Sequence, residues 1–302
     1  MKKTSEPIVF FGSGPVAAES LRLLAQNFNI KTVVTKPKPA HHKAKFPVLD
    51  VAAEINSEVI LTSTKADLVE QMQTFKSASR LGIVIDYGII IPQEVIDRFE
   101  LGIINSHFSL LPRWRGADPI TYAILNGDQK TGISLMKIVE QLDEGPLLAQ
   151  AEMSLSEEAN STTLTNDLIE LSDSLLSDIV PKYLNGEIKL TEQADKGITY
   201  SNKLKKEDGR LDFNKSAEVL ERQIRAFNEW PRSYTEIEGI RVIVTKAHVE
   251  SLSGQPGKLY HSADKLGFFT KDKVLIFDQL IPANKKEMSA SAFLAGHKIT
   301  AD

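Results

Sequence analysis

An asparagine and a histidine two residues apart are the first residues in this sequence that could do chemistry. Asn105 and His107 lie in "INSHFSLLPRWRGADP", which covers residues 104–119. If residues 101–107 form a strand, both side chains point to one face, because side chains alternate along a strand. An asparagine amide can donate to a developing oxyanion, and a histidine can transfer a proton near neutral pH. A lone histidine in such a place is often only a core residue, so its surroundings decide the interpretation.

The loop that follows the histidine supports a functional interpretation. Pro112, Gly116 and Pro119 predict a tight change of chain direction directly after the strand. Arg113 and Arg115 could bind carboxylate or phosphate groups. In open α/β sheets, ligands bind at the carboxyl ends of the strands, and this loop would lie at that edge.

Asp143 is the third polar candidate, in the turn "EQLDEG" between two apolar segments. Aspartate is common in turns, so an ordinary turn residue is the alternative. Nothing in the sequence alone requires Asp143 to meet His107.

A glycine-containing turn near the N-terminus is poor evidence for a dinucleotide site. Gly12 and Gly14 follow an apolar segment and precede a helical pattern, where backbone N–H groups could bind phosphate. The third glycine of the dinucleotide fingerprint is replaced by Ala17, and Lys36 stands where an acidic residue would end the second strand. A tight strand-to-helix turn is the favoured interpretation.

The elements that must position these residues alternate between strand and helix in the first half. Predicted strands lie at 7–12, 30–35, 81–91 and 101–107, and predicted helices at 16–28, 46–55 and 118–127, the last with Gly127 at its C-cap. Two further strands, 131–139 and 146–155, are spaced as a hairpin, and a long helix at 161–186 has serine or threonine available as N-cap. This pattern predicts an α/β domain with a mainly parallel, Rossmann-like sheet that ends in antiparallel strands.

The second half predicts a separate small domain. Residues 187–210 are polar and charged, as in a linker, and a helix is expected at 216–230. Short strands follow at close spacing, which favours a small antiparallel β-barrel of the OB type. We therefore divide the chain into a catalytic domain at 1–188, a linker at 189–206 and a barrel domain at 207–302.

Composition excludes several classes of protein. The 302 residues are 42% hydrophobic and 25% charged, with a net charge of −4 and no cysteine, so disulfide and thiolate chemistry are excluded. The apolar segment after the N-terminal lysines stops at Gly12, which is too short for a signal peptide or a membrane span. A cytoplasmic protein is expected.

Several motifs in order give the chain a specific resemblance. "INSHFSLLPRWRGADPI" followed by "LDEGPLL" resembles the folate-dependent formyltransferases, which share Asn-x-His, a Ser-Leu-Leu-Pro loop and Asp-x-Gly. "VIDYGIIIP" and "FFGSGPVAAESL" are similar to two further segments of that family. The Trp114–Arg115 pair, "KLKKEDGRLDF", "LERQIRAFNEWPRSYTEIEG" and "PANKKEMSASAFL" resemble the members that formylate methionyl-tRNA.

The resemblance implies a reaction and roles for three residues. It implies that the formyl group of 10-formyltetrahydrofolate passes to the α-amino group of methionyl-initiator-tRNA, for translation initiation, without a metal. Asn105 and protonated His107 would donate to the oxyanion of the tetrahedral intermediate. Asp143 would orient His107 and help to move protons from the amine to folate N10 through water.

The resemblance also implies two binding surfaces and a monomer. The expected folate-binding residues flank the strand ends: Tyr87, Gly88, Ile89, Ile91, Ser109, Leu110, Leu111 and Pro112. The expected tRNA contacts are basic: Lys36, Lys38, Lys43, Lys45, Arg115, Arg222, Arg225 and Arg232. Phe227 and Trp230 lie near the last three and could stack on bases, although Trp230 is expected to pack into its own domain. Arg115 could instead brace its loop.

The sequence departs from the family pattern in three places. The loop at 35–47 is several residues shorter than usual and has no glycine, although it keeps its lysines. Asp86 and Ser106 replace apolar residues of the family, and neither is expected to disturb the catalytic groups. His41 and His42 in the shortened loop lack nearby carboxylates, so a solvated basic loop is favoured over a metal site.

Other functions remain open as alternatives. A sugar-nucleotide N-formyltransferase would use the same folate donor, and some members also carry a second domain. Glycinamide ribonucleotide formyltransferases normally stop after the first domain, and the formyltetrahydrofolate dehydrogenase and hydrolase branch carries other segments. A non-catalytic RNA- or folate-binding protein would not need the asparagine, histidine and aspartate.

Overall fold

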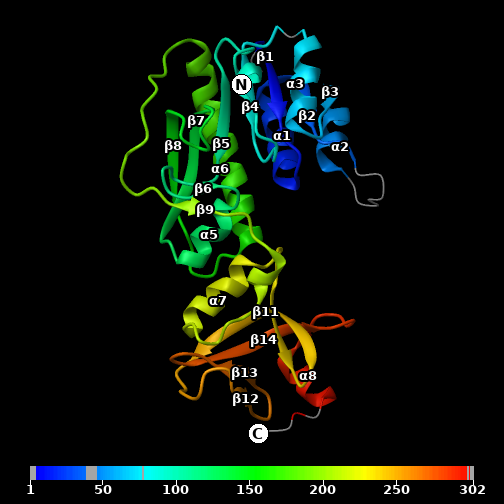
Figure 1. Ribbon diagram of the computed structural model, residues 1–302, viewed down its shortest axis with the longest axis vertical. Coiled ribbons are helices and arrows are strands. Elements are labelled where there is room, and N and C mark those ends of the chain that lie inside the picture. The colour runs from blue at the N-terminus through cyan, green and yellow to red at the C-terminus, as the bar shows by residue number, and fades with distance from the viewer. Residues whose placement is uncertain (1–4, 39–45, 77, 298, 300–302) are drawn as a thin grey trace. The chain divides into compact units, whose positions relative to one another are not determined.

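The chain folds into two compact units (Figure 1). A computed structural model describes residues 5–38, 46–76, 78–297 and 299. The first unit contains the described residues up to Gly116, together with Thr131–Met153 and Thr165–Tyr200. The second contains Ala117–Lys130, Ser154–Leu164 and the described residues from Ser201 onward. Lys43, Lys45, His41 and His42 lie outside the described residues.

The first unit is built on a seven-stranded sheet in the order β3-β2-β1-β4-β5-β7-β8. Its strands are β1 (Pro7–Phe11), β2 (Asn29–Thr35), β3 (Glu58–Leu61), β4 (Leu81–Val84), β5 (Ile103–His107), β7 (Lys130–Lys137) and β8 (Leu147–Ser154). Strands β1 to β5 pair in parallel, and β7 pairs antiparallel with β5. The predicted mainly parallel α/β sheet with an antiparallel end is confirmed.

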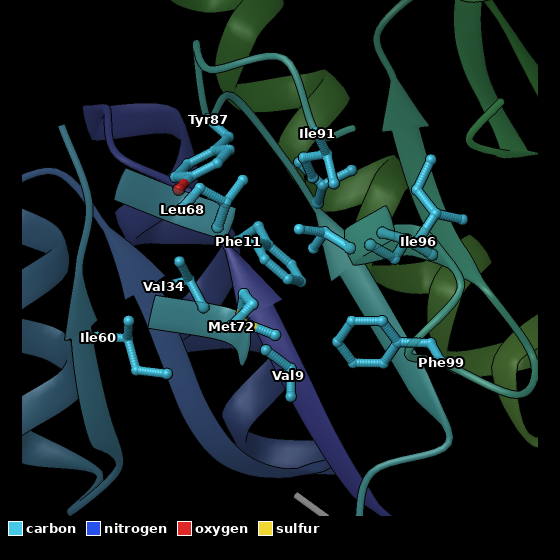
Figure 2. Packing of buried hydrophobic residues seen from close by; sticks show 13 residues of the cluster. Val9, Phe11, Val34, Ile60, Leu68, Met72, Tyr87, Ile91, Ile96 and Phe99 are labelled. Carbon is cyan, nitrogen blue, oxygen red and sulfur yellow. The ribbon is translucent and has the colours of Figure 1, made fainter. Parts of the chain in front are cut away.

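One face of this sheet is covered by two helices that the sequence analysis did not predict. Apolar residues of α3 (Lys65–Thr74) and α4 (Gln93–Ile96) pack on β1, β2 and β4, where Leu68, Met72 and Ile96 belong to one buried cluster with Phe11 (Figure 2). Thr64 caps α3 by accepting from the N–H of Asp67 at 3.1 Å, which is a local signal of a helix start. Ile103 of β5 belongs to the same cluster, so this core fixes the face on which residues 105 and 107 lie.

The remaining helices are α1 (Pro15–Asn27), α2 (Pro47–Glu54), α5 (Pro119–Asn126) and α6 (Ser161–Leu184). The predicted C-cap of α5 is confirmed, because Gly127 adopts φ +69°. The predicted serine or threonine N-cap of α6 is wrong. Asn160 caps this helix, accepting from the N–H of Thr163 at 3.0 Å while Thr163 Oγ1 accepts from the N–H of Asn160.

The predicted strand at 81–91 is shorter in the structure than in the sequence analysis. Strand β4 ends at Val84 because Asp86 and Gly88 both adopt positive φ, +47° and +68°, and turn the chain. The "DYGIIIP" segment is therefore a loop at the carboxyl edge of the sheet.

The second unit contains an antiparallel sheet in the order β10-β11-β14-β13-β12, with β15 paired to β14. Its strands are β10 (Ser233–Ile237), β11 (Ile240–Glu250), β12 (Leu259–His261), β13 (Leu266–Phe269), β14 (Val274–Pro282) and β15 (Met288–Ser289). Leu220 and Ile224 of α7 (Ala217–Ala226) and Phe293 of α8 (Ala290–Gly296) pack in its core. This half-barrel bears out the expected small antiparallel β domain. The short β6 (Arg115–Gly116) and β9 (Tyr200–Ser201) and the 3-10 helix η1 (Lys206–Gly209) complete the elements.

Candidate active site

Strand β5 presents Asn105 and His107 on one face of the sheet, as predicted. Ser106, between them, points to the opposite face, where its hydroxyl is buried and lies 2.7 Å from the hydroxyl of Ser172 in α6. Across the antiparallel pairing, Asn105 is opposite Met136 and His107 is opposite Ser134. The alternation of the strand therefore separates the polar pair from the residue that anchors the strand to a helix.

Asp143 lies beside both residues. Its Oδ1 accepts from Asn105 Nδ2 at 3.4 Å, and its Oδ2 lies 3.7 Å from His107 Nδ1. The His107 and Asp143 side chains are only 6% and 9% exposed, so the two groups face each other largely shielded from solvent. The structure thus brings together the three residues that the sequence analysis proposed as catalytic.

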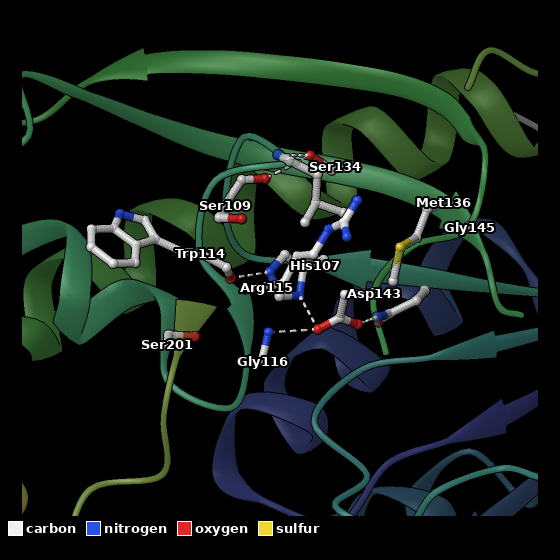
Figure 3. A network of polar contacts seen from close by, with 12 residues as sticks. His107, Ser109, Trp114, Arg115, Gly116, Ser134, Met136, Asp143, Gly145 and Ser201 are labelled. Carbon is white, nitrogen blue, oxygen red and sulfur yellow. Dashed lines mark hydrogen bonds and ion pairs between the residues drawn. The ribbon is translucent and has the colours of Figure 1, made fainter. Parts of the chain in front are cut away.

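The backbone of the loop after β5 also contacts His107 and Asp143 (Figure 3). The carbonyl oxygen of Trp114 lies 2.8 Å from His107 Nε2. A carbonyl oxygen can only accept, so this contact requires a proton on Nε2. The N–H of Gly116 donates to Asp143 Oδ2 at 2.7 Å. Trp114 and Asp143 both adopt positive φ, +58° and +54°, which is uncommon away from glycine and is often found at functional sites.

The Ser-Leu-Leu-Pro loop is anchored by a serine that the sequence analysis did not single out. Ser134 of β7 is fully buried; its hydroxyl donates to Ser109 O at 2.6 Å and accepts from the N–H of Leu111 at 2.9 Å. Gln150 Nε2 donates to the same hydroxyl and to Leu111 O. Ser109 Oγ donates to Arg113 O at 2.6 Å, which closes the turn. Side chains of β7 and β8 therefore hold the backbone of this loop in place by hydrogen bonds.

Arg115 is buried and bound on both sides of its guanidinium. Nη1 pairs with Glu144 Oε1 at 3.0 Å, and Nε and Nη2 donate to Gln193 Oε1 at 3.2 and 2.8 Å. With 6% of its surface exposed, Arg115 offers little to a tRNA, and this placement favours the bracing role that the sequence left open. Gln193 was missed because it lies in the polar segment assigned to the linker, where no periodic pattern marks it.

The turn after β1 carries a carboxylate where a dinucleotide phosphate would lie. Ser13 is held against the β4 loop by its N–H, which donates to Asp86 O, and by its hydroxyl, which donates to Tyr87 O at 2.6 Å. A Cβ at Gly14 would fall 2.1 Å from Asp86 Oδ2, so the Asp86 carboxylate lies against the N-terminus of α1. A negative charge there disfavours phosphate, in agreement with the absence of the full fingerprint.

The expected folate residues fall into two groups by exposure. Tyr87, Ile91, Ser109 and Leu111 are buried, whereas Gly88 is exposed and Ile89, Leu110 and Pro112 are partly buried. The Tyr87 hydroxyl contacts Thr62 Oγ1, and burial raises the pKa of the phenol to about 12. Ile90, which was not predicted as a contact, is 72% exposed. In the loop after β4, the accessible residues are therefore the exposed Asp86, Gly88 and Ile90, with Ile89 partly exposed.

The expected tRNA residues lie in both units. In the first, Lys36 Nζ donates to Gly88 O at 3.1 Å, and Lys38 is exposed. In the second, Arg222 Nε donates to Leu125 O, and Arg225 binds both oxygens of Glu221 and Ala159 O, whereas Arg232 is exposed. The packing expected for Trp230 is wrong, since 56% of it is exposed, and Phe227 is instead buried in the core.

The described residues contain neither a membrane-spanning helix nor a metal-binding cluster. Within the part of the chain that the structure describes, no helix is both long and apolar enough to cross a membrane. Among the same residues, no group of three or more histidine, cysteine, aspartate or glutamate side chains could hold a metal ion.

Comparison with known proteins assigns the family. A family model described as "Formyl transferase" matches residues 7–180, and one described as "Formyl transferase, C-terminal domain" matches residues 203–298. The methionyl-tRNA formyltransferase of Myxococcus xanthus is 35% identical over 299 residues, which cover 97% of this chain and 95% of that protein. The chain belongs to the methionyl-tRNA formyltransferase family. The methionyl-tRNA formyltransferase of Neisseria meningitidis serogroup B is 33% identical over 302 residues, covering 97% and 98% of the two proteins.

A solved structure shares the fold of this member of the methionyl-tRNA formyltransferase family. The N-formyltransferase from Helicobacter canadensis, solved with folinic acid and dTDP-3-aminofucose, superposes with a TM-score of 0.69 at 16% identity. The match covers 89% of this chain and 98% of that one. At this identity the likeness establishes the fold alone.

Proposed function

We propose that this protein transfers the formyl group of 10-formyltetrahydrofolate to the α-amino group of methionyl-initiator-tRNA, as a cytoplasmic monomer that needs no metal. The observation that carries the proposal is the convergence of Asn105, His107 and Asp143 at the carboxyl end of β5. The full-length similarity to proteins named methionyl-tRNA formyltransferase supports the choice of acceptor.

The three side chains suit a transfer through a tetrahedral intermediate. The amine nitrogen attacks the formyl carbon, and the carbonyl oxygen gains negative charge. Asn105 Nδ2 keeps a second hydrogen beside its 3.4 Å contact with Asp143. The protonated His107 supplies another donor at Nδ1, because its Nε2 hydrogen binds Trp114 O. When the bond to folate N10 breaks, the amine has lost a proton and N10 has gained one. Asp143 and His107 assist this exchange as base and acid.

Loops at the carboxyl edge of the sheet are proposed to receive the folate. The Ser-Leu-Leu-Pro loop and the loop after β4 lie beyond β5 and β4, which are adjacent parallel strands. The backbone at Gly88 and Ile89 and the partly buried Leu110 and Pro112 are accessible there. Four expected folate residues are buried and would support these two loops from beneath their surface: Tyr87, Ile91, Ser109 and Leu111. Open α/β sheets bind ligands at this edge.

The tRNA is proposed to contact the lysine loop and the second domain. We propose a functional division into residues 1–188, a connecting segment at 189–206, and a tRNA-binding domain at 207–302. Arg232 is exposed, with the exposed Trp230 two residues away, and this pair suits phosphate contact with base stacking. Lys36, Lys38, Lys43 and Lys45 supply positive charge from the first domain, while Arg222 and Arg225 are proposed to shape the surface through their bonds to backbone carbonyls.

An acceptor assay tests the proposal and its alternative. A sugar-nucleotide formyltransferase is the second candidate, because the Helicobacter canadensis protein shares the fold over nearly its whole length. We expect purified protein with 10-formyltetrahydrofolate to formylate methionyl-tRNA and not a dTDP-linked amino sugar. Formylation of the amino sugar alone would overturn the acceptor assignment.

A further inference from the structure

Within the first unit, the segment after α6 is bonded to β8 and to the loops of the candidate site. Thr191 exchanges two backbone hydrogen bonds with Leu147 of β8, at 2.7 and 2.9 Å. Thr199 O accepts from the N–H of Arg115, and Thr199 Oγ1 accepts from the N–H of Trp114, both at 2.9 Å. A segment that only connected two domains would not need these contacts.

Gln193, between these two anchors, makes four hydrogen bonds to oxygen and nitrogen partners with its side-chain amide, and its Nε2 also lies 3.9 Å from Met136 Sδ. Nε2 donates to Asp143 O at 2.8 Å and to Gly145 O at 2.9 Å, which uses both of its hydrogens. Oε1 accepts from Nε and Nη2 of Arg115. Two carbonyl oxygens at one end and a guanidinium at the other leave only one orientation of the amide that satisfies all four bonds.

These bonds join the two pieces of backbone that hold His107 and Asp143. Arg115 stands between Trp114, whose carbonyl contacts His107, and Gly116, whose N–H binds the Asp143 carboxylate. At the other end, Gln193 holds the Asp143 backbone in its positive-φ conformation. The end of the Asp143 turn packs closely on β7, because a Cβ at Gly145 would fall 1.7 Å from Lys137 O. This close approach of the two backbones leaves the turn little room to shift.

We propose that Gln193 is a positioning residue for formyl transfer, which sets the placement of Asp143 against His107 by clamping the Asp143 turn to the Arg115 loop. This inference rests on the proposed function. Gln193 touches no reacting atom; it acts through the two loops. A misplacement of reacting groups by about 1 Å can cost about 100-fold in rate, so loss of the clamp should lower kcat.

Three variants test the proposal against a matched control. Gln193→Leu removes all four bonds at similar volume, and Gln193→Glu keeps an acceptor for Arg115 but opposes two carbonyl oxygens with a carboxylate. Gln193→Ala shortens the side chain. Glu192→Ala changes the exposed neighbouring residue and should behave as wild type. We expect kcat to fall about 10- to 100-fold in the Leu and Glu variants, with KM for tRNA and for folate changed less than about threefold.

The split between kcat and KM separates positioning from a loss of structure. A merely structural role would lower the thermal midpoint and the active fraction of enzyme, and Gln193→Glu with wild-type kcat per active site would overturn the proposal. A double variant with Arg115→Lys should lose less than the product of the two single losses, because both changes break the two bonds between Arg115 and Gln193. Additive losses would also overturn it.

The wild-type reaction separates this inference from the proposed function. If wild-type protein does not formylate methionyl-tRNA, the proposed acceptor fails. The ratios of kcat are then measured with whichever amine acceptor the wild type uses, and unchanged ratios would overturn the role of Gln193.

Discussion

The N–H of Gly116 donates a 2.7 Å hydrogen bond to Asp143 Oδ2. This bond ties the loop after β5 to the turn after β7, and it leaves the other carboxylate oxygen to Asn105. The aspartate therefore has fixed partners on both oxygens before any substrate binds. A carboxylate held in this way loses little freedom when it orients a histidine in the reaction.

Removal of any of the three central side chains should stop turnover. We expect Asn105→Ala, His107→Ala and Asp143→Ala each to lower kcat at least about 100-fold, since each removes a donor or its orienting partner. Ser106→Ala is the matched control: Ser106 lies in the same strand but faces Ser172 on the opposite side. Single-turnover formylation of methionyl-tRNA, with circular dichroism to monitor the fold, provides the measurement. Near-normal activity in one variant would remove that residue from the mechanism.

Exchange of Arg115 for lysine should distinguish bracing from tRNA contact. Lysine keeps the charge but cannot bind Gln193 and Glu144 at once as a planar guanidinium does. We expect kcat to fall about tenfold with KM for tRNA little changed. Arg80→Lys, at a surface arginine with two bonds to Glu100, controls for the substitution itself. A raised KM for tRNA with unchanged kcat would instead place Arg115 at the tRNA.

Stability should fall above pH 10 because of Tyr87. Burial raises the pKa of its phenol to about 12, whereas the unfolded chain has a value near 10. The unfolded state therefore loses its proton first as the pH rises. This contribution to stability is complete below pH 10 and is lost between about pH 10 and 12, with a total of about 2–3 kcal/mol.

Urea unfolding of the wild type and of Tyr87→Phe at pH 9 and pH 11 measures this effect. The Tyr87→Phe protein should lose less stability between the two pH values, although it is less stable at pH 9 because the contact with Thr62 is gone. The same pH dependence in both proteins would show that another group is responsible.

Charge reversal in the lysine loop should weaken tRNA binding selectively. We expect Lys43→Glu with Lys45→Glu to raise KM for tRNA far more than KM for folate, because phosphate contacts depend on positive charge. The variant should also show a weaker dependence of KM for tRNA on salt. Equal changes in the two KM values would indicate that this loop does not touch tRNA.

Local patterns in the sequence already determined the main parts of the catalytic domain. Alternation along residues 101–107 placed Asn105 and His107 on one face, and Gly127 marked the end of a helix, because each depends on chain geometry over a few residues. The order of motifs along the chain was sufficient to indicate the family. The missed helix α3 and the cap of α6 had local signals in Thr64 and Asn160, whereas Gln193 stands in a polar segment without a distinctive pattern.

Only the tertiary structure decided which of these residues meet. Asp143 reaches Asn105 and His107 because β7 pairs antiparallel with β5 in one register, and a local pattern does not specify a register between strands whose partners are 27 to 33 residues apart. The same holds for Arg115, which the fold buries against Gln193, and for Trp230, which it exposes. Burial depends on how distant segments pack, so a charged residue in a loop and a tryptophan near a helix end cannot be placed from their neighbours in the chain.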